Sequence, residues 1–218
     1  MDYILQVLGP MLEGALTTTA LFAIVIVLAL PLGFLITMMA KSRIKPVSWI
    51  ASAYIYIIRG TPLLLQLFFI YFGLPLIPGI GQYLVLERFT AACVGFVLNY
   101  AAYFAEIYRS GIESIPVGQY EAAQLLGYNK SQTFFKIVLP QVVKIVLPSV
   151  TNEVITLVKD TSLVYSVSYI EMFALAKQIA AAQTTVVPFV IAGVFYYIFN
   201  FVVAWVMEWF EKKLNYYR

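Results

Sequence analysis

The chain contains no histidine and a single cysteine, Cys93, which lies within an apolar run. One cysteine cannot form an intrachain disulfide, and without histidine a zinc or haem site is not expected. Catalysis with histidine as the general base is excluded as well. We therefore predict no metal site and no cofactor in this chain.

Charged residues are scarce too. They make up 11% of the 218 residues, whereas hydrophobic residues account for 62% and aromatic residues for 16%. A soluble domain averages about 25% charged residues, so the composition indicates a membrane protein rather than a small soluble core. The net charge of +3 comes from scattered Lys and Arg, and nucleic acid is not an expected partner. The beginning of the chain has no basic segment and no small-residue cleavage site, so we expect no cleaved signal peptide.

Long apolar runs are what the sequence has in abundance. A helix needs about 20 mainly apolar residues to cross a bilayer, and five segments meet this requirement. We expect an all-α, polytopic membrane protein that forms one domain over residues 1–218. The five expected spans are 14–40, 47–72, 89–108, 137–158 and 187–210.

The basic residues orient these spans, because cytosolic loops are enriched in Lys and Arg. With five spans, nine of the 14 basic residues fall on one side, and only Arg88 and Lys177 lie clearly in loops on the other. We therefore expect the N-terminus outside and the C-terminus in the cytosol. The nine residues assigned to the cytosolic side are Lys41, Arg43, Lys45, Arg109, Lys130, Lys136, Lys212, Lys213 and Arg218.

The longest cytosolic loop, about 110–136, is polar in a chain that is otherwise mostly apolar. Pro116 is a start signal for a helix, and Glu121 follows near its N-terminus, where the helix dipole favours an acid. Ala122 and Ala123 have little side-chain bulk, so a partner protein could approach the backbone closely. On composition alone, a surface helix lying on the membrane explains the loop equally well.

The spacing within and after this loop resembles the EAA motif of permease subunits of prokaryotic ABC importers. The matching residues are Glu121, Ala122, Ala123, Gly127, Ile137, Leu139 and Pro140. Three further runs resemble the polar amino acid permeases: RGTP at 59–62 followed by Gln66, AEI-x-R-x-G-I at 105–112, and KDTSL at 159–163. The four motifs occur in order over nearly the whole chain. The sequence is thus similar to the histidine, glutamine and arginine permeases of type I ABC importers.

This resemblance implies a transport subunit, not an enzyme, in the prokaryotic cell membrane. It implies that the loop helix fits a cleft on a separate cytosolic ATPase, present in two copies. The chain has no G-x4-G-K-[ST] phosphate loop, so ATP and Mg belong to that partner. A second permease copy or a paralogue, and an extracytoplasmic solute-binding protein, are the other implied partners. The expected ATPase-coupling residues are Glu121, Ala122, Ala123, Leu125, Leu126 and Gly127.

Polar residues within the spans are candidates for substrate binding, because ionisable groups in a membrane usually face a cavity. Glu153 and Asp160 are two helical turns apart on one face of span 137–158, and Thr156 lies between them. Asn99 and Tyr103 are one turn apart on span 89–108. We predict that these five residues bind substrate.

Each candidate also has a structural explanation. Asp160 could cap its helix or pair near Lys159, and Asn99 could be an interhelical hydrogen-bond partner. Glu106, one turn after Tyr103, is better explained by an ion pair with Arg109.

Glu153 differs from the other candidates, because no basic residue lies three or four positions away from it. A carboxylate without a local partner indicates a cationic cargo, and we expect a basic amino acid, arginine above lysine or histidine. Glutamine, glutamate or another polar amino acid is the alternative cargo. An ion-coupled secondary transporter is a more distant alternative. A membrane-embedded enzyme is disfavoured, because no span carries a paired nucleophile and base.

Overall fold

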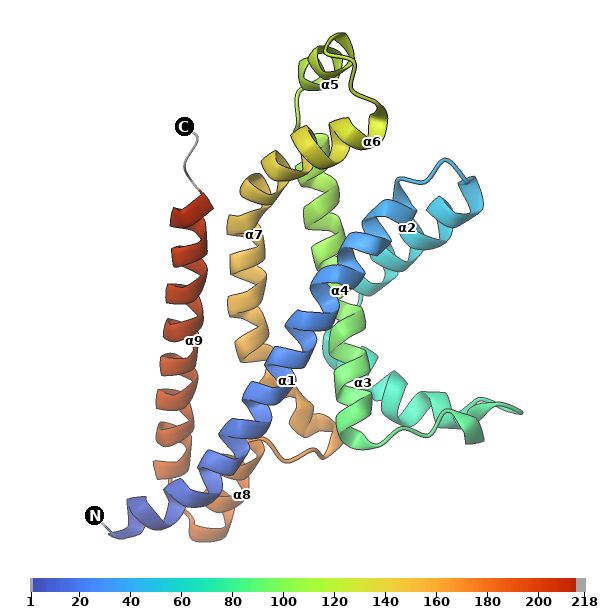
Figure 1. Cartoon of the computed structure of the whole chain (residues 1–218). Coiled ribbons are helices and arrows are strands. Elements are labelled where there is room, and N and C mark those ends of the chain that lie inside the picture. Colours follow the sequence, from blue (N-terminus) through green and yellow to red (C-terminus); the bar gives the residue numbers. More distant parts are fainter. Residues whose placement is uncertain (1, 215–218) are drawn as a thin grey trace.

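Helices form almost all of the chain in a computed structural model, which describes residues 2–214, with side chains from residue 6 onward. Four long helices dominate the bundle in Figure 1: α1 (Asp2–Ala40), α4 (Arg88–Glu113), α7 (Leu139–Asp160) and α9 (Val187–Leu214). The helical stretches built on these four are long and apolar enough to cross a membrane. No strand occurs in residues 2–214. The expected all-α membrane fold is confirmed.

The remaining expected span, 47–72, is not one straight helix. It consists of α2 (Lys45–Arg59) and a second stretch that begins with α3 (Leu63–Phe68), and the two are bent by 110° relative to each other. The cause lies in the sequence between them, because Pro62 has no backbone N–H and disfavours helical geometry at the residue before it. Within residues 2–214 there are thus four candidate spans, and five if the bent pair is counted as one span. After α3 it continues as a π-helical turn, η1 (Phe69–Gly73), and two short 3₁₀ turns, η2 (Leu74–Leu76) and η3 (Gly81–Tyr83).

Gln66 satisfies the backbone groups that the break leaves without helical partners. Its side-chain nitrogen donates to the carbonyl oxygens of Ile58 (2.8 Å) and Thr61 (3.1 Å) and to the Thr61 hydroxyl (2.8 Å). An unpaired backbone carbonyl in hydrocarbon costs several kcal/mol, so a broken membrane helix needs such a side chain. The glutamine of the RGTP-x3-Q run thus stabilises the bend.

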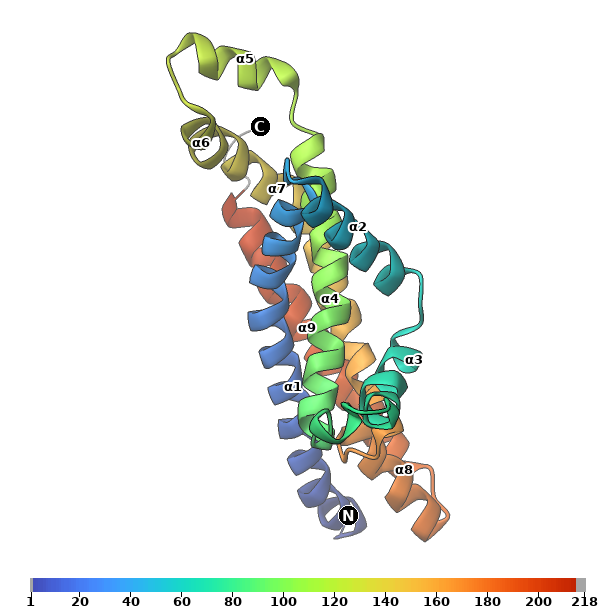
Figure 2. The same ribbon diagram turned by 90° about the vertical axis from the view of Figure 1, so that its right-hand side faces the viewer.

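The two ends of the bundle are built differently. Figure 2 shows α5 (Val117–Leu125) and α6 (Lys130–Thr133) projecting at one end, with α8 (Met172–Gln183) and the beginning of α1 at the other. The first helix starts at Asp2, well before the expected position 14. Its early turns are ordered by a small second core, in which Val7 and Met11 pack near Met172 and Ala176.

The core of the bundle is the crossing of α1 and α4, which pack more extensively than any other two helices described. Gly33 makes this approach possible, because a Cβ atom there would lie 2.8 Å from the Phe104 Cβ and 2.9 Å from the Ala101 carbonyl oxygen. The Thr37 hydroxyl donates to the Ala105 carbonyl oxygen across the same contact (2.9 Å). Small residues and interhelical hydrogen bonds hold membrane helices together where burial from water contributes little.

We expect Gly33→Val to lower the stability of the folded chain by about 1–3 kcal/mol, the usual range for overpacking a tight contact. The measurement is the thermal unfolding midpoint in detergent. Gly193→Val is the matched control, since a Cβ atom at Gly193 in α9 meets no heavy atom within 4 Å apart from the backbone of its own helix and its chain neighbours. Equal midpoints for the two variants would contradict the tight crossing.

Candidate functional site

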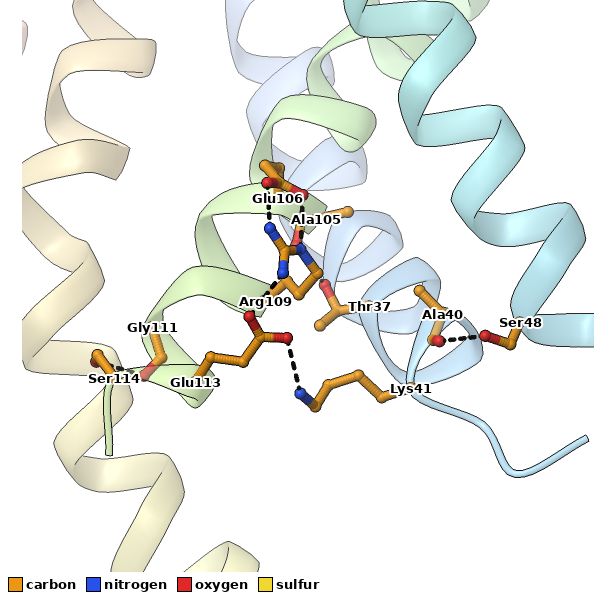
Figure 3. A network of polar contacts seen from close by, with 10 residues as sticks. All are labelled: Thr37, Ala40, Lys41, Ser48, Ala105, Glu106, Arg109, Gly111, Glu113 and Ser114. Carbon is orange, nitrogen blue, oxygen red and sulfur yellow. Dashed lines mark hydrogen bonds and ion pairs between the residues drawn. The ribbon is translucent and has the colours of Figure 1, made fainter. Parts of the chain in front are cut away.

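A chain of alternating charges joins three helices at the half of the bundle that carries α5. Arg109 donates from Nε and Nη2 to the two carboxylate oxygens of Glu106, and the Nε bond measures 2.9 Å. Arg109 Nη1 also donates to Glu113 (2.6 Å), which pairs through its other oxygen with Lys41, the residue directly after α1 (3.3 Å; Figure 3). The fifth member is Arg59, at the end of α2, whose Nη1 lies 3.5 Å from Glu106 Oε1. The structural ion pair expected for Glu106 and Arg109 is confirmed.

Arg59 was not among the predicted site residues, although the structure places it beside one of them. Its guanidinium lies 5.6 Å from the ring centroid of Tyr103, a cation–π geometry. Arg59 also interacts electrostatically with Glu153 of α7. Arg59 is a charged residue within the mainly apolar segment 47–72, and this feature of the sequence could have identified it as a candidate.

Asp160 accepts a hydrogen bond from the hydroxyl of Tyr100 (2.8 Å), so α4 and the end of α7 are joined by a polar contact. Tyr100 is buried at 2% exposure. Lys159 is exposed and makes no ion pair with Asp160 among the described residues. Sequence reasoning missed Tyr100, because it shares a helix face with Phe96 and Phe104 and has the pattern of a core aromatic residue.

Glu153 is half-buried and has no hydrogen bond or ion pair with any described residue. It interacts at longer range with Asp160, which repels its negative charge, and with Arg59, which attracts it. Thr156, one turn further along α7, donates its hydroxyl back to the Asn152 carbonyl oxygen (2.9 Å). An acid left without a direct partner in this position is able to bind a cation.

Asn99 lies deep in the bundle, at 4% exposure, and its side-chain nitrogen donates to the Gln66 side-chain oxygen (3.0 Å). This bond connects α4 to the break between α2 and α3. The interhelical role considered for Asn99 is therefore confirmed. The predicted substrate residues come from α4 and α7, which pack against each other. Within residues 6–214, no three side chains of His, Cys, Asp or Glu group as metal ligands.

The loop between α4 and α7 folds into a compact hairpin of short helices. Gly127 turns the chain after α5 with φ +79°, a left-handed conformation that favours glycine. Asn129 then begins α6 with a capping box, in which its side chain accepts from the Gln132 N–H (2.9 Å). A π-helical turn, η4 (Phe134–Val138), connects α6 to α7.

Five of the six predicted coupling residues are exposed on this hairpin. Leu125 is 90% exposed and Leu126 is 75% exposed, so two neighbouring apolar side chains lie on the surface of the hairpin. Glu121, Ala122 and Gly127 are exposed as well. Ala123 is 1% exposed, so its side chain faces the interior of the hairpin and its backbone carbonyl accepts from the Tyr128 N–H (3.0 Å).

Comparison with known families connects this geometry with a transport role. Residues 29–216 match the model of binding-protein-dependent transport system inner membrane components. The chain belongs to this family. It is a multi-pass membrane protein and a permease subunit, so ATP hydrolysis is carried out by a separate ATPase subunit. Membership also decides against the ion-coupled secondary transporter.

Individual relatives are similar over almost their whole length. The L-cystine transport system permease protein TcyB of Bacillus subtilis is 35% identical over 99% of this chain and 92% of its own. The arginine transport system permease protein ArtQ of the same organism is 36% identical over 94% of this chain and 92% of its own. A crystal structure described as an amino acid ABC transporter with histidines superposes with a TM-score of 0.87 at 30% identity, covering 97% of both chains. The resemblance to amino acid permeases of ABC importers is confirmed.

We expect Glu106→Gln to lower the stability of the bundle by about 1.5–3 kcal/mol, the range for hydrogen bonds to charged groups. The substitution leaves Arg59 and Arg109 facing a neutral amide, so two cations lose their shared partner. Glu113→Gln is the matched control, because Glu113 is half exposed and exposed ion pairs contribute about 0–1 kcal/mol. Thermal unfolding in detergent measures both, and a larger effect from Glu113→Gln would contradict the central position of Glu106.

Proposed function

We propose that this permease subunit carries a basic amino acid across the membrane, arginine in preference to lysine or histidine. The observation that carries the proposal is Glu153, a half-buried carboxylate without a direct partner in the described part of the chain. Ionised carboxylates are costly in a membrane protein interior, so such a group is retained where a cation visits it. Asp160 lies on the same helix and interacts with Glu153 electrostatically, and together they provide negative charge for a cationic side chain.

A basic amino acid also carries an α-carboxylate, which two acids cannot bind. Arg59 supplies the complementary charge, since it interacts with Glu153 and lies over the ring of Tyr103. In this arrangement the cargo side chain approaches Glu153 and Asp160 while its carboxylate faces Arg59. Tyr103, Asn99 and Thr156 complete the proposed site.

The alternative cargo is a neutral or acidic polar amino acid such as glutamine or glutamate. The named relatives transport chemically different amino acids, cystine in one case and arginine in another. The charge of Glu153 favours the basic cargo, because a second acid on the same helix would repel glutamate and give no advantage to glutamine.

The transport cycle requires partners that we infer from the family. Two copies of the ATPase, with ATP and Mg, act on the cytosolic side, and a second copy of this chain or a paralogue completes the pathway. An extracytoplasmic solute-binding protein delivers the cargo. In this assembly the chain lies in a prokaryotic cytoplasmic membrane, with its N-terminus outside and its C-terminus in the cytosol.

The α5 hairpin is the proposed contact with the ATPase. Leu125 and Leu126 are too exposed to serve the fold, and a leucine side chain contributes about 1.5–3 kcal/mol when it is fully buried. The hairpin projects beyond the long helices (Figure 2), so a cytosolic partner reaches it without entering the membrane.

We expect Glu153→Gln to reduce the apparent affinity for arginine by about 10- to 100-fold, the equivalent of a charge-assisted hydrogen bond. The measurement is radiolabelled arginine uptake into proteoliposomes, with competition by histidine, glutamine and glutamate. Glu208→Gln is the matched control, since Glu208 is exposed on α9 and pairs only weakly with Lys212 (3.8 Å). Unchanged arginine uptake in Glu153→Gln would remove this residue from the site.

We expect Leu125→Asp combined with Leu126→Asp to release the ATPase from the permease, because two charges replace the apolar contact. Co-purification of the ATPase with the tagged permease measures this. The control is Leu76→Asp, which changes an equally exposed leucine (79%) outside the hairpin. Full retention of the ATPase by the double variant, or ATP-dependent uptake after deletion of 117–130, would refute the proposed contact.

A further inference from the structure

Arg88 and Lys177, which were expected in external loops, lie in helices and line one groove on the proposed external side. They are far apart in sequence, Arg88 at the start of α4 and Lys177 within α8. The groove consists of two adjoining cavities of about 510 and 660 Å³, which share Arg88, Ser168, Tyr169 and Ile170. Lys177 lines the first cavity and Tyr71 the second. The fold thus gathers cations on a side of the molecule where they are rare.

Neither cation has an acidic partner among the described residues. Arg88 donates from Nε to the hydroxyl of Tyr71 (3.2 Å), and Lys177 lies 4.9 Å from the ring centroid of Tyr165. Glu87 lines the second cavity next to Arg88 but forms no ion pair with it. Both cations are exposed. Their charge therefore stays available to an anion that enters the groove.

The turn at Ser168 and Tyr169 lines both cavities. Ser168 adopts φ 57° and ψ 31°, a left-handed conformation that is costly for a residue other than glycine and that persists where surrounding contacts impose it. The turn is supported by Tyr169, whose ring packs against Phe89 at 5.2 Å between centroids. It follows directly after η5 (Thr161–Val167), which connects it to Asp160 of the proposed cargo site. The groove is thus connected to Asp160 along the chain by the single short helix η5.

We propose that this groove, lined by Arg88, Lys177 and Ser168, receives acidic side chains of the extracytoplasmic solute-binding protein. The inference rests on the proposed function, which requires such a protein. Charge complementarity identifies the occupant, because two unpaired cations beside aromatic side chains match a carboxylate-bearing protein surface. A partner docked here would release its cargo next to the turn that leads to Asp160.

The experiment uses the complete importer, this chain with its ATPase, in nanodiscs of neutral phosphatidylcholine. ATP hydrolysis is measured against the concentration of the importer's own solute-binding protein, loaded with arginine. We expect Arg88→Glu with Lys177→Glu to raise the half-maximal concentration at least about 10-fold and to leave the basal hydrolysis rate unchanged. Added salt should weaken stimulation of the wild type more than that of the variant. Glu87→Gln is the control within the groove, and it should lower the half-maximal concentration or leave it as it is.

An unchanged half-maximal concentration in the double variant would overturn the groove proposal, while stimulation of the wild type would still support the proposed function. If the double variant is impaired only in discs that contain anionic phosphatidylglycerol, the groove binds a lipid headgroup and the proposal is wrong. If the solute-binding protein does not stimulate the wild type at all, the proposed function fails and the groove proposal fails with it.

Discussion

One carboxylate shared by two guanidinium groups fixes the relation between three helices. Glu106 of α4 binds Arg109 in its own helix and Arg59 at the end of α2. Arg109 is linked through Glu113 to Lys41, directly after α1. A charge in a poorly polarisable environment is tolerated when it is paired and hydrogen-bonded, and is costly otherwise. The ion pair therefore holds the end of α2 in place directly before residues 60–62, where the helix is interrupted. The bend itself follows from Pro62 and Gln66, whereas the position of Arg59 beside Tyr103 and near Glu153 depends on this pairing.

Membrane architecture could be predicted from the sequence because hydropathy and the distribution of Lys and Arg act over whole segments. The shape of segment 47–72 could not be predicted in the same way. An average over about 20 residues has the same value for a straight and for a bent helix, and Gly60 and Pro62 were recognised as parts of a motif and not as a break. Gln66 makes the break possible, but its bonds to Ile58 and Thr61 form only once the chain has already turned.

In the candidate site, too, contacts within one helix could be predicted from the sequence, whereas contacts between helices could not. That Glu153 lacks a partner within its own helix follows from counting residues. Among the described residues it has no direct partner from other helices either, since Arg59 is paired with Glu106. The bond between Tyr100 and Asp160 depends on how α4 packs against α7, which no local pattern specifies. The burial of Ala123 likewise depends on the reversal of the chain at Gly127. The EAA motif alone therefore does not tell which of its residues are buried and which are exposed.

The length of α1 has a consequence for how the molecule sits in its membrane. At 1.5 Å per residue, its 39 residues extend over roughly 58 Å, about twice the thickness of the hydrocarbon layer. Tilting alone cannot absorb such a mismatch, because it would require an inclination of roughly 60°, well beyond the usual range of 0–40° for a spanning helix. Several turns of α1 therefore stand outside the hydrocarbon. Since α1 is locked to α4 at Gly33 and to α8 near Met11, the height of this protruding end is set by protein contacts and not by the thickness of the lipid.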